Sequence, residues 1–281
     1  MINIGVTGWG DHESLYQNRV PSRDKLQEYA AHFPTVEVDA SFYAIQSKNT
    51  VLKWVNDTPE AFRFIVKAYQ GMTGHQRGEQ QHATKEEMFQ AFIASLEPYV
   101  QYNKLAMVLF QFPPWFDCTK EHVSYLRYCR EKMGNFPVAL EFRNQTWFYP
   151  QYLENTLRFM EGERWIHSIC DEPQAGIGSV PTILQATSKE KTLVRMHGRN
   201  VAAWMKPGGD NWREVRYLYR YNEKELLEWK NNLLKLQQET RDIYVVFNNN
   251  SGGDAADNAK QLIQLLNIDY QGLAAKQLDL F

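Results

Sequence analysis

Eight short apolar runs constrain the fold of this chain more than any other feature of its sequence. Each run stops at a polar or charged residue, at the point where a β-strand would end. The runs cover residues 4–8, 36–39, 64–67, 107–111, 139–143, 167–171, 194–197 and 244–248. Because β-runs that alternate with helical segments are typical of parallel sheets, eight in succession predict an α/β fold, a single closed TIM-type (β/α)8 barrel. In such barrels the reaction site lies at the C-terminal ends of the strands.

Length and composition agree with one barrel. The chain has 281 residues, and a TIM barrel takes roughly 250. At 43% hydrophobic and 23% charged residues, it can bury a substantial core and is not disordered. No apolar run approaches the ~20 residues that a membrane-spanning helix needs. The first residues lead directly into a strand, without a basic segment or a cleavage site, so we expect a cytoplasmic protein.

Cysteine usage and net charge exclude several classes of protein. Cys118, Cys129 and Cys170 have no C-x-x-C spacing, so we expect reduced thiols rather than disulfides, zinc ribbons or redox motifs. The net charge of −2 argues against a protein that holds nucleic acid by overall charge alone.

The segments between the runs have helical periodicity. Apolar residues recur at three- and four-residue intervals over residues 88–100, 223–239 and 255–266, which predicts helices that pack outside the barrel. The connection over 172–191 lacks such a stripe and is expected to be irregular. Long connections over 69–84 and 198–220 are expected to form walls of the site. We expect one domain over residues 1–268, followed by a tail over 269–281.

The strand ends carry charged residues in pairs. Side chains two residues apart share one face of a strand, so Glu37 with Asp39, Glu141 with Arg143, and Arg195 with His197 are predicted to point into the barrel mouth. We expect further polar residues to join them, namely Lys67, Gln111, Asp171, Asn248 and Asn249. A charge buried alone costs several kcal/mol, so these groups must pair with one another, bind a ligand, or both.

This combination of residue types predicts an anion-binding catalytic mouth. Lys67, Arg143 and Arg195 would bind a phosphate, and Gln111, Asn248 and Asn249 would orient the substrate. Proton transfer would fall to His197, Glu141, Glu37 and Asp171. Trp9, Tyr43 and Trp147 would supply aromatic walls. Two alternatives stay open: an internal salt-bridge network that only holds the barrel together, and a divalent metal bound by Glu37, Glu141, Asp171 and His197. The three nearby cations count against the metal.

Several sequence blocks resemble those of the YecE-like family, catalogued as domain of unknown function 72. The blocks are Gly5-Val6-Thr7-Gly8-Trp9, residues 36–43 and 64–68, Gln111-Phe112-Pro113-Pro114, Glu141-Phe142-Arg143 with Trp147, Asp171-Glu172-Pro173, residues 195–199 and Phe247-Asn248-Asn249. They follow in order from about residue 2 to 266. The resemblance implies a TIM barrel with these residues lining one mouth, and it implies no known activity. Asp39 stands where the family pattern usually has asparagine, which adds a negative charge.

The chain ends with Gln277, Leu278, Asp279, Leu280 and Phe281. This pentapeptide resembles the one by which bacterial replication and repair proteins bind the sliding clamp. In that interpretation Leu278, Leu280 and Phe281 fill a hydrophobic pocket and Gln277 supplies a hydrogen bond. The alternative is that the same residues pack back onto the barrel.

These observations favour a hydrolase that acts on a phosphate-bearing substrate, with nucleic acid as one such substrate. One alternative is a non-catalytic module that binds a phospho-ligand or DNA and is recruited by the sliding clamp. Another is a barrel that converts a sugar or metabolite, in which the tail is structural.

Overall fold

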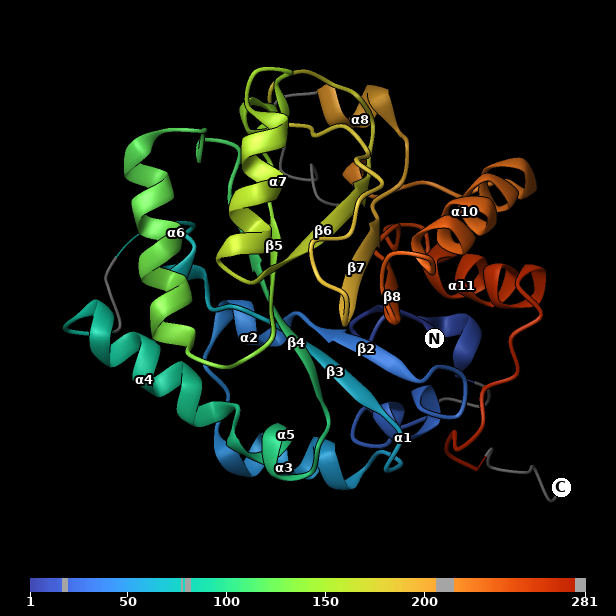
Figure 1. Ribbon diagram of the computed structural model, residues 1–281. Helices are drawn as coiled ribbons and strands as arrows, with labels where there is room; N and C mark the ends of the chain where they lie inside the picture. Colours follow the sequence, from blue (N-terminus) through green and yellow to red (C-terminus); the bar gives the residue numbers. More distant parts are fainter. Residues whose placement is uncertain (17–19, 77, 79–81, 206–214, 276–281) are drawn as a thin grey trace, which may run out of the picture.

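The computed structural model, which describes residues 1–16, 20–76, 78, 82–205 and 215–275, is a closed barrel of parallel strands in chain order (Figure 1). The strands are β1 Ile2–Thr7, β2 Thr35–Val38, β3 Arg63–Lys67, β4 Leu105–Gln111, β5 Val138–Glu141, β6 Trp165–Asp171, β7 Lys191–Met196 and β8 Asp242–Phe247. Each predicted apolar run overlaps one of these strands. The TIM-type barrel is therefore confirmed.

Helices surround the strands (Figure 1). They are α1 Lys25–Tyr29, α2 Ala40–Tyr43, α3 Lys48–Asn56, α4 Lys85–Ser95, α5 Glu97–Gln101, α6 Lys120–Met133, α7 Leu153–Gly162, α8 Val201–Met205, α10 Glu223–Leu236 and α11 Asp254–Leu265. Short 3-10 turns occupy Glu13–Leu15, Gln70–Met72 and Gln145–Phe148. The connection over 172–190 contains no helix, as its composition predicts.

One helix prediction needs a correction. The single helix expected over residues 88–100 is two helices, because α4 ends at Ser95 and α5 begins at Glu97. Pro98 explains the break: proline has no backbone N–H to donate and its ring clashes with the carbonyl four residues earlier. Proline is tolerated in the first turn of a helix, which is where α5 places it.

The barrel interior changes from apolar to charged along its axis. Its lower part is one apolar cluster of buried side chains from β3 to β8, namely Ile65, Ala106, Met107, Leu109, Ala139, Ile166, Leu193, Tyr244 and Val246. Toward the C-terminal ends of the strands the interior positions become Glu37, Glu141 and Arg195, all fully buried. The barrel interior is therefore apolar around this cluster, and Glu37, Glu141 and Arg195 lie nearer the C-terminal ends of the strands.

The chain segment after α11 packs against the start of the barrel. The Tyr270 hydroxyl accepts a hydrogen bond from the Ile4 amide (2.9 Å) and donates one to the Ile2 carbonyl (3.1 Å). The Ala274 amide donates to the Ala30 carbonyl (3.0 Å). These contacts tie the segment to β1 and to the end of α1. The predicted clamp-binding residues Gln277, Leu278, Leu280 and Phe281 lie outside the described residues.

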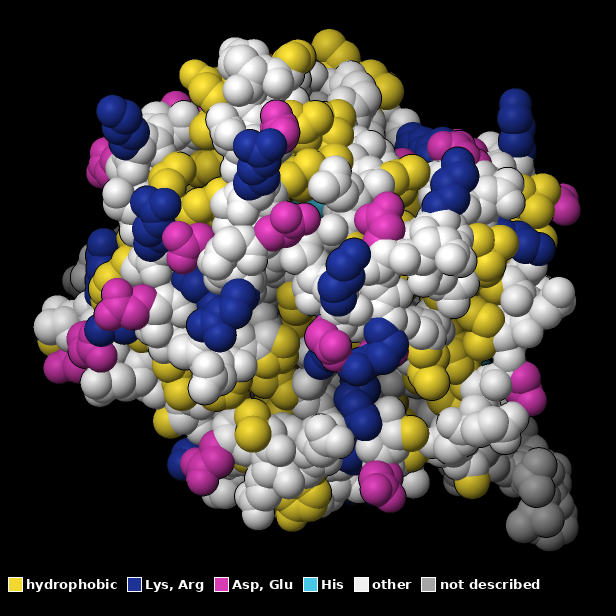
Figure 2. Space-filling view, viewed as in Figure 1, with side chains coloured by type: hydrophobic (Ala, Val, Ile, Leu, Met, Phe, Trp, Pro, Cys, Tyr) yellow, Lys and Arg dark blue, Asp and Glu magenta, His cyan; other side chains and the backbone are white. Residues whose placement is uncertain are grey.

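Positive and negative side chains are interspersed over the face of the molecule shown in Figure 2, in keeping with the small net charge. Among the described residues, no helix has the length and apolar character needed to cross a membrane.

Candidate active site at the barrel mouth

Arg195 lies at the centre of the charged part of the barrel. Its Nε and Nη2 donate to the two carboxylate oxygens of Glu37, at 2.8 and 2.6 Å. Its Nη1 lies 2.9 Å from both oxygens of Glu141 and 3.3 Å from Oε1 of Gln111. These side chains come from β7, β2, β5 and β4, so one guanidinium joins four strands. Such bidentate, charge-assisted contacts are strong and geometrically specific.

Arg143, just after β5, forms a second centre beside the first. Its Nε lies 2.8 Å from Oε1 of Glu141, and its Nη1 lies 2.5 Å from Oε2 of Glu172. Its Nη2 lies 2.9 Å from Nε2 of His197. All four side chains are buried. Glu141 therefore bridges the two arginines, and Arg143 connects it to His197 and Glu172.

The contact with Arg143 fixes the protonation of His197. His197 Nε2 lies 2.9 Å from Nη2 of Arg143 and 3.5 Å from Oε1 of Glu141. A guanidinium can only donate hydrogen bonds, so the closer contact requires Nε2 to accept, which is met by a neutral ring with its proton on Nδ1. The side-chain nitrogen of Asn248 lies 3.0 Å from Nδ1. Since an N–H group cannot accept a proton from Nδ1, this tautomer requires the Asn248 amide to turn its oxygen toward the ring. Burial, with the positive charges of Arg143 and Arg195, holds the pKa of His197 well below its usual value. His197 is thus a base whose lone pair is occupied by Arg143.

The carboxylates of this cluster differ in their affinity for protons. Burial alone would raise the pKa of Glu141, but Arg195 and Arg143 hold it well below its usual range. Burial raises the pKa of Glu37, and Arg195 offsets only part of that effect. Burial raises the pKa of Glu172 to about 7, against the effect of Arg143. Burial is thus the main cause of the raised pKa of Glu172, and its contact with Arg143 offsets only part of that effect.

Lys67 lies nearer to solvent than the arginines. Its Nζ is 3.1 Å from Oδ1 of Asp39 and lies over the Phe42 ring, 4.8 Å from the centroid. The side chain of Lys67 is 13% exposed and that of Asp39 is 36% exposed. The structure therefore brings Lys67, Glu37, Gln111, Glu141, Arg143, Arg195, His197 and Asn248 to one end of the barrel.

Five predicted site residues are not part of this cluster, and strand alternation explains two of them. Asp171 points out of the barrel, where both carboxylate oxygens accept from Nε of Arg199 at 3.0 Å. Asn249 also points outward, and its amide donates to Asn258 and to the Tyr219 carbonyl. At the end of β6 the inward positions are Cys170 and Glu172, and just after β8 the inward position is Asn248. The expectation that Asp171 and Asn249 face the mouth is therefore corrected.

The other three are the predicted aromatic walls Trp147, Trp9 and Tyr43. Trp147 is buried among other aromatic rings. Its ring stacks on Phe142 with centroids 4.1 Å apart and an interplanar angle of 3°, and its Nε1 donates to the Phe116 carbonyl. Only 1% of the residue is exposed, so it packs in the layer outside the strands and cannot serve as a substrate wall. Trp9 packs edge-on against Trp54, at 5.1 Å. Tyr43 is 53% exposed at the end of α2.

Two described parts of the connection between β7 and α10 lie beside the cluster. Trp204, in α8, has the guanidinium of Arg216 at 3.8 Å from its ring centroid and that of Arg143 at 5.7 Å. Tyr217 lies 6.1 Å from the His197 ring and 6.1 Å from the Trp204 ring. Sequence reasoning placed this connection at the site but did not single out Arg216, nor Glu172 on the other side of Arg143.

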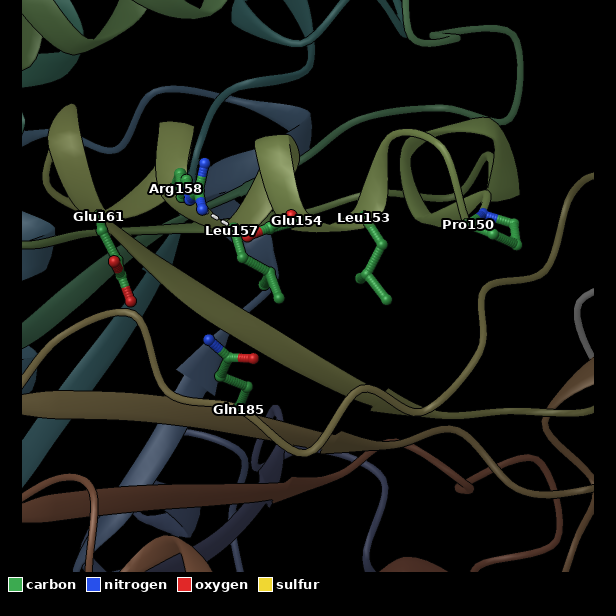
Figure 3. Close-up of a pocket in the computed structure, with 7 residues that line it drawn as sticks. All are labelled: Pro150, Leu153, Glu154, Leu157, Arg158, Glu161 and Gln185. Atoms are coloured by element: carbon green, nitrogen blue, oxygen red, sulfur yellow. Dashed lines mark hydrogen bonds and ion pairs between the residues drawn. The ribbon is translucent and has the colours of Figure 1, made fainter.

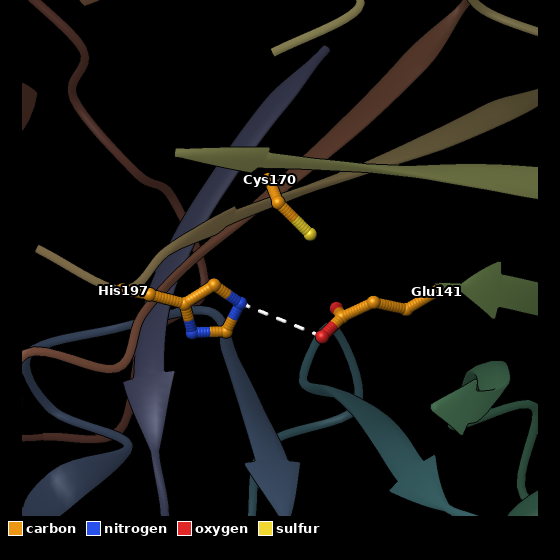
Figure 4. A group of neighbouring side chains, drawn as sticks. All are labelled: Glu141, Cys170 and His197. Atoms are coloured by element: carbon orange, nitrogen blue, oxygen red, sulfur yellow. Dashed lines mark ion pairs between the residues drawn. The ribbon is translucent and has the colours of Figure 1, made fainter. Parts of the chain in front are cut away.

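The predicted metal ligands are not gathered as expected. Glu37 is bound by Arg195 and Asp171 points outward, whereas the ligand atoms of Glu141, Cys170 and His197 lie within 4.8 Å of one another (Figure 4). Carboxylate, thiol and imidazole are zinc-ligand types. However, Glu141 and His197 both contact Arg143 already. As placed, these atoms bind a guanidinium, and a metal ion would have to displace it.

A pocket of about 400 Å³ lies elsewhere, between α7 and the connection from β6 to β7. Its walls come from Pro150, Leu153, Glu154, Leu157, Arg158, Glu161 and Gln185 (Figure 3). None of the predicted site residues lines it. It is separate from the charged cluster.

Known proteins resemble this chain over most or all of its length. It is 66% identical to the UPF0759 protein YunF of Bacillus subtilis (strain 168), covering 100% of both chains. It is 23% identical to the UPF0759 protein YecE of Escherichia coli (strain K12), over 82% of each chain. A crystal structure of a DUF72 family protein from Enterococcus faecalis V583 superposes with a TM-score of 0.93 at 40% identity, covering 99% of this chain and 100% of that chain.

A second DUF72 structure, from Thermotoga maritima MSB8, superposes with a TM-score of 0.81 at 27% identity, covering 95% of this chain and 100% of that chain. The family model described as "Protein of unknown function DUF72" matches residues 3–279. The chain therefore belongs to the DUF72 family, as its sequence blocks predict.

Proposed function

We propose that this protein is a hydrolase that cleaves a phosphate ester at the C-terminal mouth of its barrel, with nucleic acid among its candidate substrates. The observation that carries the proposal is the buried group formed by Arg143, Glu141, Glu172 and His197. It places an ionised carboxylate, a neutral imidazole and a carboxyl group that titrates near neutral pH around one guanidinium. Titratable groups whose environments push their pKa values apart are typical of acid–base catalytic sites.

The two arginines have different roles in this proposal. Arg195 is saturated by Glu37 and Glu141 and joins four strands, so it positions the catalytic groups. Arg143 is the guanidinium that contacts His197, and Lys67 lies closer to solvent. When Arg143 turns its Nη2 toward a phosphate oxygen, the lone pair of His197 Nε2 becomes available. Arg143 and Lys67 would then stabilise the charge that develops on the phosphoryl group.

These residues can carry out both proton transfers that the hydrolysis requires. His197 would accept a proton from the attacking water while the new P–O bond forms. Glu172 would donate a proton to the leaving oxygen as the ester bond breaks. Its pKa of about 7 leaves much of it protonated at physiological pH, as a general acid requires.

His197→Gln tests this role for the imidazole. Glutamine keeps an amide group near Asn248 and Arg143 but cannot take up a proton. We expect release of phosphate or alcohol from a panel of phosphomonoesters and phosphodiesters to fall by about 10²–10⁴-fold, with little change in melting temperature. Equal turnover by the variant and the wild type would reject the assignment, and turnover of neutral glycosides alone would favour the sugar-converting alternative.

We also propose a bacterial sliding clamp as partner, on the strength of the terminal residues Gln277, Leu278, Leu280 and Phe281. The contacts of Tyr270 and Ala274 with the barrel support it, because they anchor the chain shortly before this pentapeptide. Tethering to DNA through the clamp would raise the local concentration of substrate. A non-catalytic DNA-binding module recruited in the same way is the alternative. Surface plasmon resonance with the clamp should show saturable binding that is lost when residues 277–281 are deleted; binding by the deleted protein would refute the assignment.

A further inference from the structure

Four aromatic side chains form a continuous row on one side of the barrel mouth. The Tyr43 and Phe42 centroids are 5.2 Å apart, Phe42 and His75 are 5.2 Å apart, and His75 and Trp115 are 5.9 Å apart. They come from the segments that follow β2, β3 and β4. We call these four residues the aromatic rim. Its assembly from three separate connections is a tertiary arrangement, not a local pattern.

The two ends of the aromatic rim are open to solvent. Trp115 is 55% exposed and Tyr43 is 53% exposed. Single exposed aromatics are ordinary on protein surfaces, but two that are connected through further rings beside a catalytic mouth suggest a binding surface. Lys67 is close to the rim because its Nζ lies over the Phe42 ring. It is the last residue of β3, so it lies at the same end of the barrel as the buried cluster.

We propose that the aromatic rim binds the unpaired bases of single-stranded nucleic acid. Exposed aromatic rings stack on bases of any sequence, and a nearby cation follows the phosphate backbone. Bases in a duplex are already stacked and paired, so they cannot offer their faces to Tyr43 or Trp115. This inference rests on the proposed function, since it supplies the part of the substrate that the phosphate-binding residues do not contact.

The charge distribution agrees with binding that depends on stacking. The net charge is −2, so the protein has no overall positive charge from which counterion release could supply most of the affinity. The aromatic rim then carries the main share of the binding energy. Affinity should depend on the two exposed rings more than on salt.

Fluorescence anisotropy with a labelled oligothymidylate of about ten nucleotides tests the proposal. Trp115→Ala and Tyr43→Ala should each weaken binding about tenfold, the effect of losing one stacked base. Tyr43→Phe should bind as tightly as the wild type, because it keeps the ring and loses only the hydroxyl. Tyr102→Ala is the matched control, since Tyr102 is 43% exposed but lies between α5 and β4, at the other end of the strands.

The proposal is overturned if the wild-type protein shows no saturable binding, or if all four variants bind alike. It is also overturned if a neutral glucose oligomer competes with the oligonucleotide and loses affinity in the same variants, which would identify a saccharide subsite. The outcome is separable from that of the proposed function. A Glu172→Gln variant that no longer hydrolyses esters but still binds the oligonucleotide supports both, whereas rim-dependent binding by a protein that hydrolyses nothing retains only this inference.

Discussion

Replacing Arg195 with methionine tests whether its guanidinium offsets the free-energy cost of burying carboxylates inside the barrel. Methionine keeps the unbranched stem and removes all five donors. Glu141 retains Arg143 and the Ser168 hydroxyl as partners, whereas both hydrogen bonds described for the Glu37 carboxylate come from Arg195. Arg195→Met therefore leaves one fully buried carboxylate without compensation.

The expected loss is about 3–5 kcal/mol in the free energy of unfolding, which is the cost of removing one member of a buried ion pair. That is a large part of the roughly 5–15 kcal/mol that stabilises a typical domain. The double variant Arg195→Met/Glu37→Gln should recover part of the loss, because the stranded charge is gone. The exposed pair Arg158–Glu154 on α7 is the matched control, and Arg158→Met should cost less than about 1 kcal/mol.

The pH dependence has a definite sign. Burial already raises the pKa of Glu37 in the folded protein, and removing Arg195 raises it further. A carboxyl group with a raised folded-state pKa takes up a proton on folding, so its contribution is favourable at low pH and is lost as pH rises. The deficit of Arg195→Met should therefore grow between about pH 5 and pH 8. Urea denaturation followed by circular dichroism measures it, and a deficit below about 1 kcal/mol at every pH would refute the argument.

Three further predictions concern side chains whose contacts the structure defines. Glu172→Gln should abolish the proposed ester hydrolysis and remove the limb of the pH–rate profile near its pKa of about 7. Asp171→Asn, one residue away but facing outward, should lower stability and leave that profile unchanged. The opposite pattern would favour Asp171 as the acid. Trp147→Ala should cost about 3–5 kcal/mol in urea denaturation because it empties a buried aromatic stack, and a loss below about 1 kcal/mol would place the ring outside the core. Tyr270→Phe should cost about 1–3 kcal/mol, since the Ile4 amide loses its acceptor; unchanged stability would mean that water replaces the hydroxyl.

The barrel can be predicted from the sequence because each of its strands has the same local pattern of residues. Each strand is a short apolar run that ends in a polar residue, and the missing stripe over 172–191 correctly predicts the missing helix. The error at residues 88–100 came from following apolar periodicity past Pro98. A proline rule applied to the same segment separates α4 from α5.

The site was predictable as far as strand alternation was applied consistently. Glu141 with Arg143 and Arg195 with His197 were placed by counting two residues along a strand. The same count from Ser168, which contacts Glu141, gives Cys170 and Glu172 as inward positions and excludes Asp171. The contacts of Trp204 and Arg216 with the cluster could not be predicted, because they depend on how a long connection folds back rather than on any period in the sequence.

The contacts of each arginine indicate whether that arginine has a structural role or belongs to the proposed site. Salt bridges in a protein interior gain little net stability over well-packed apolar residues, so a network of three carboxylates and two guanidiniums is an expensive way to close a barrel. Arg195 nevertheless fits a scaffold role, since its contacts on four strands use all of its nitrogens. Arg143 differs, because one of its nitrogens contacts a neutral histidine rather than a carboxylate. That contact gains the least from charge pairing, so it is the one that an anionic substrate can replace at the lowest cost.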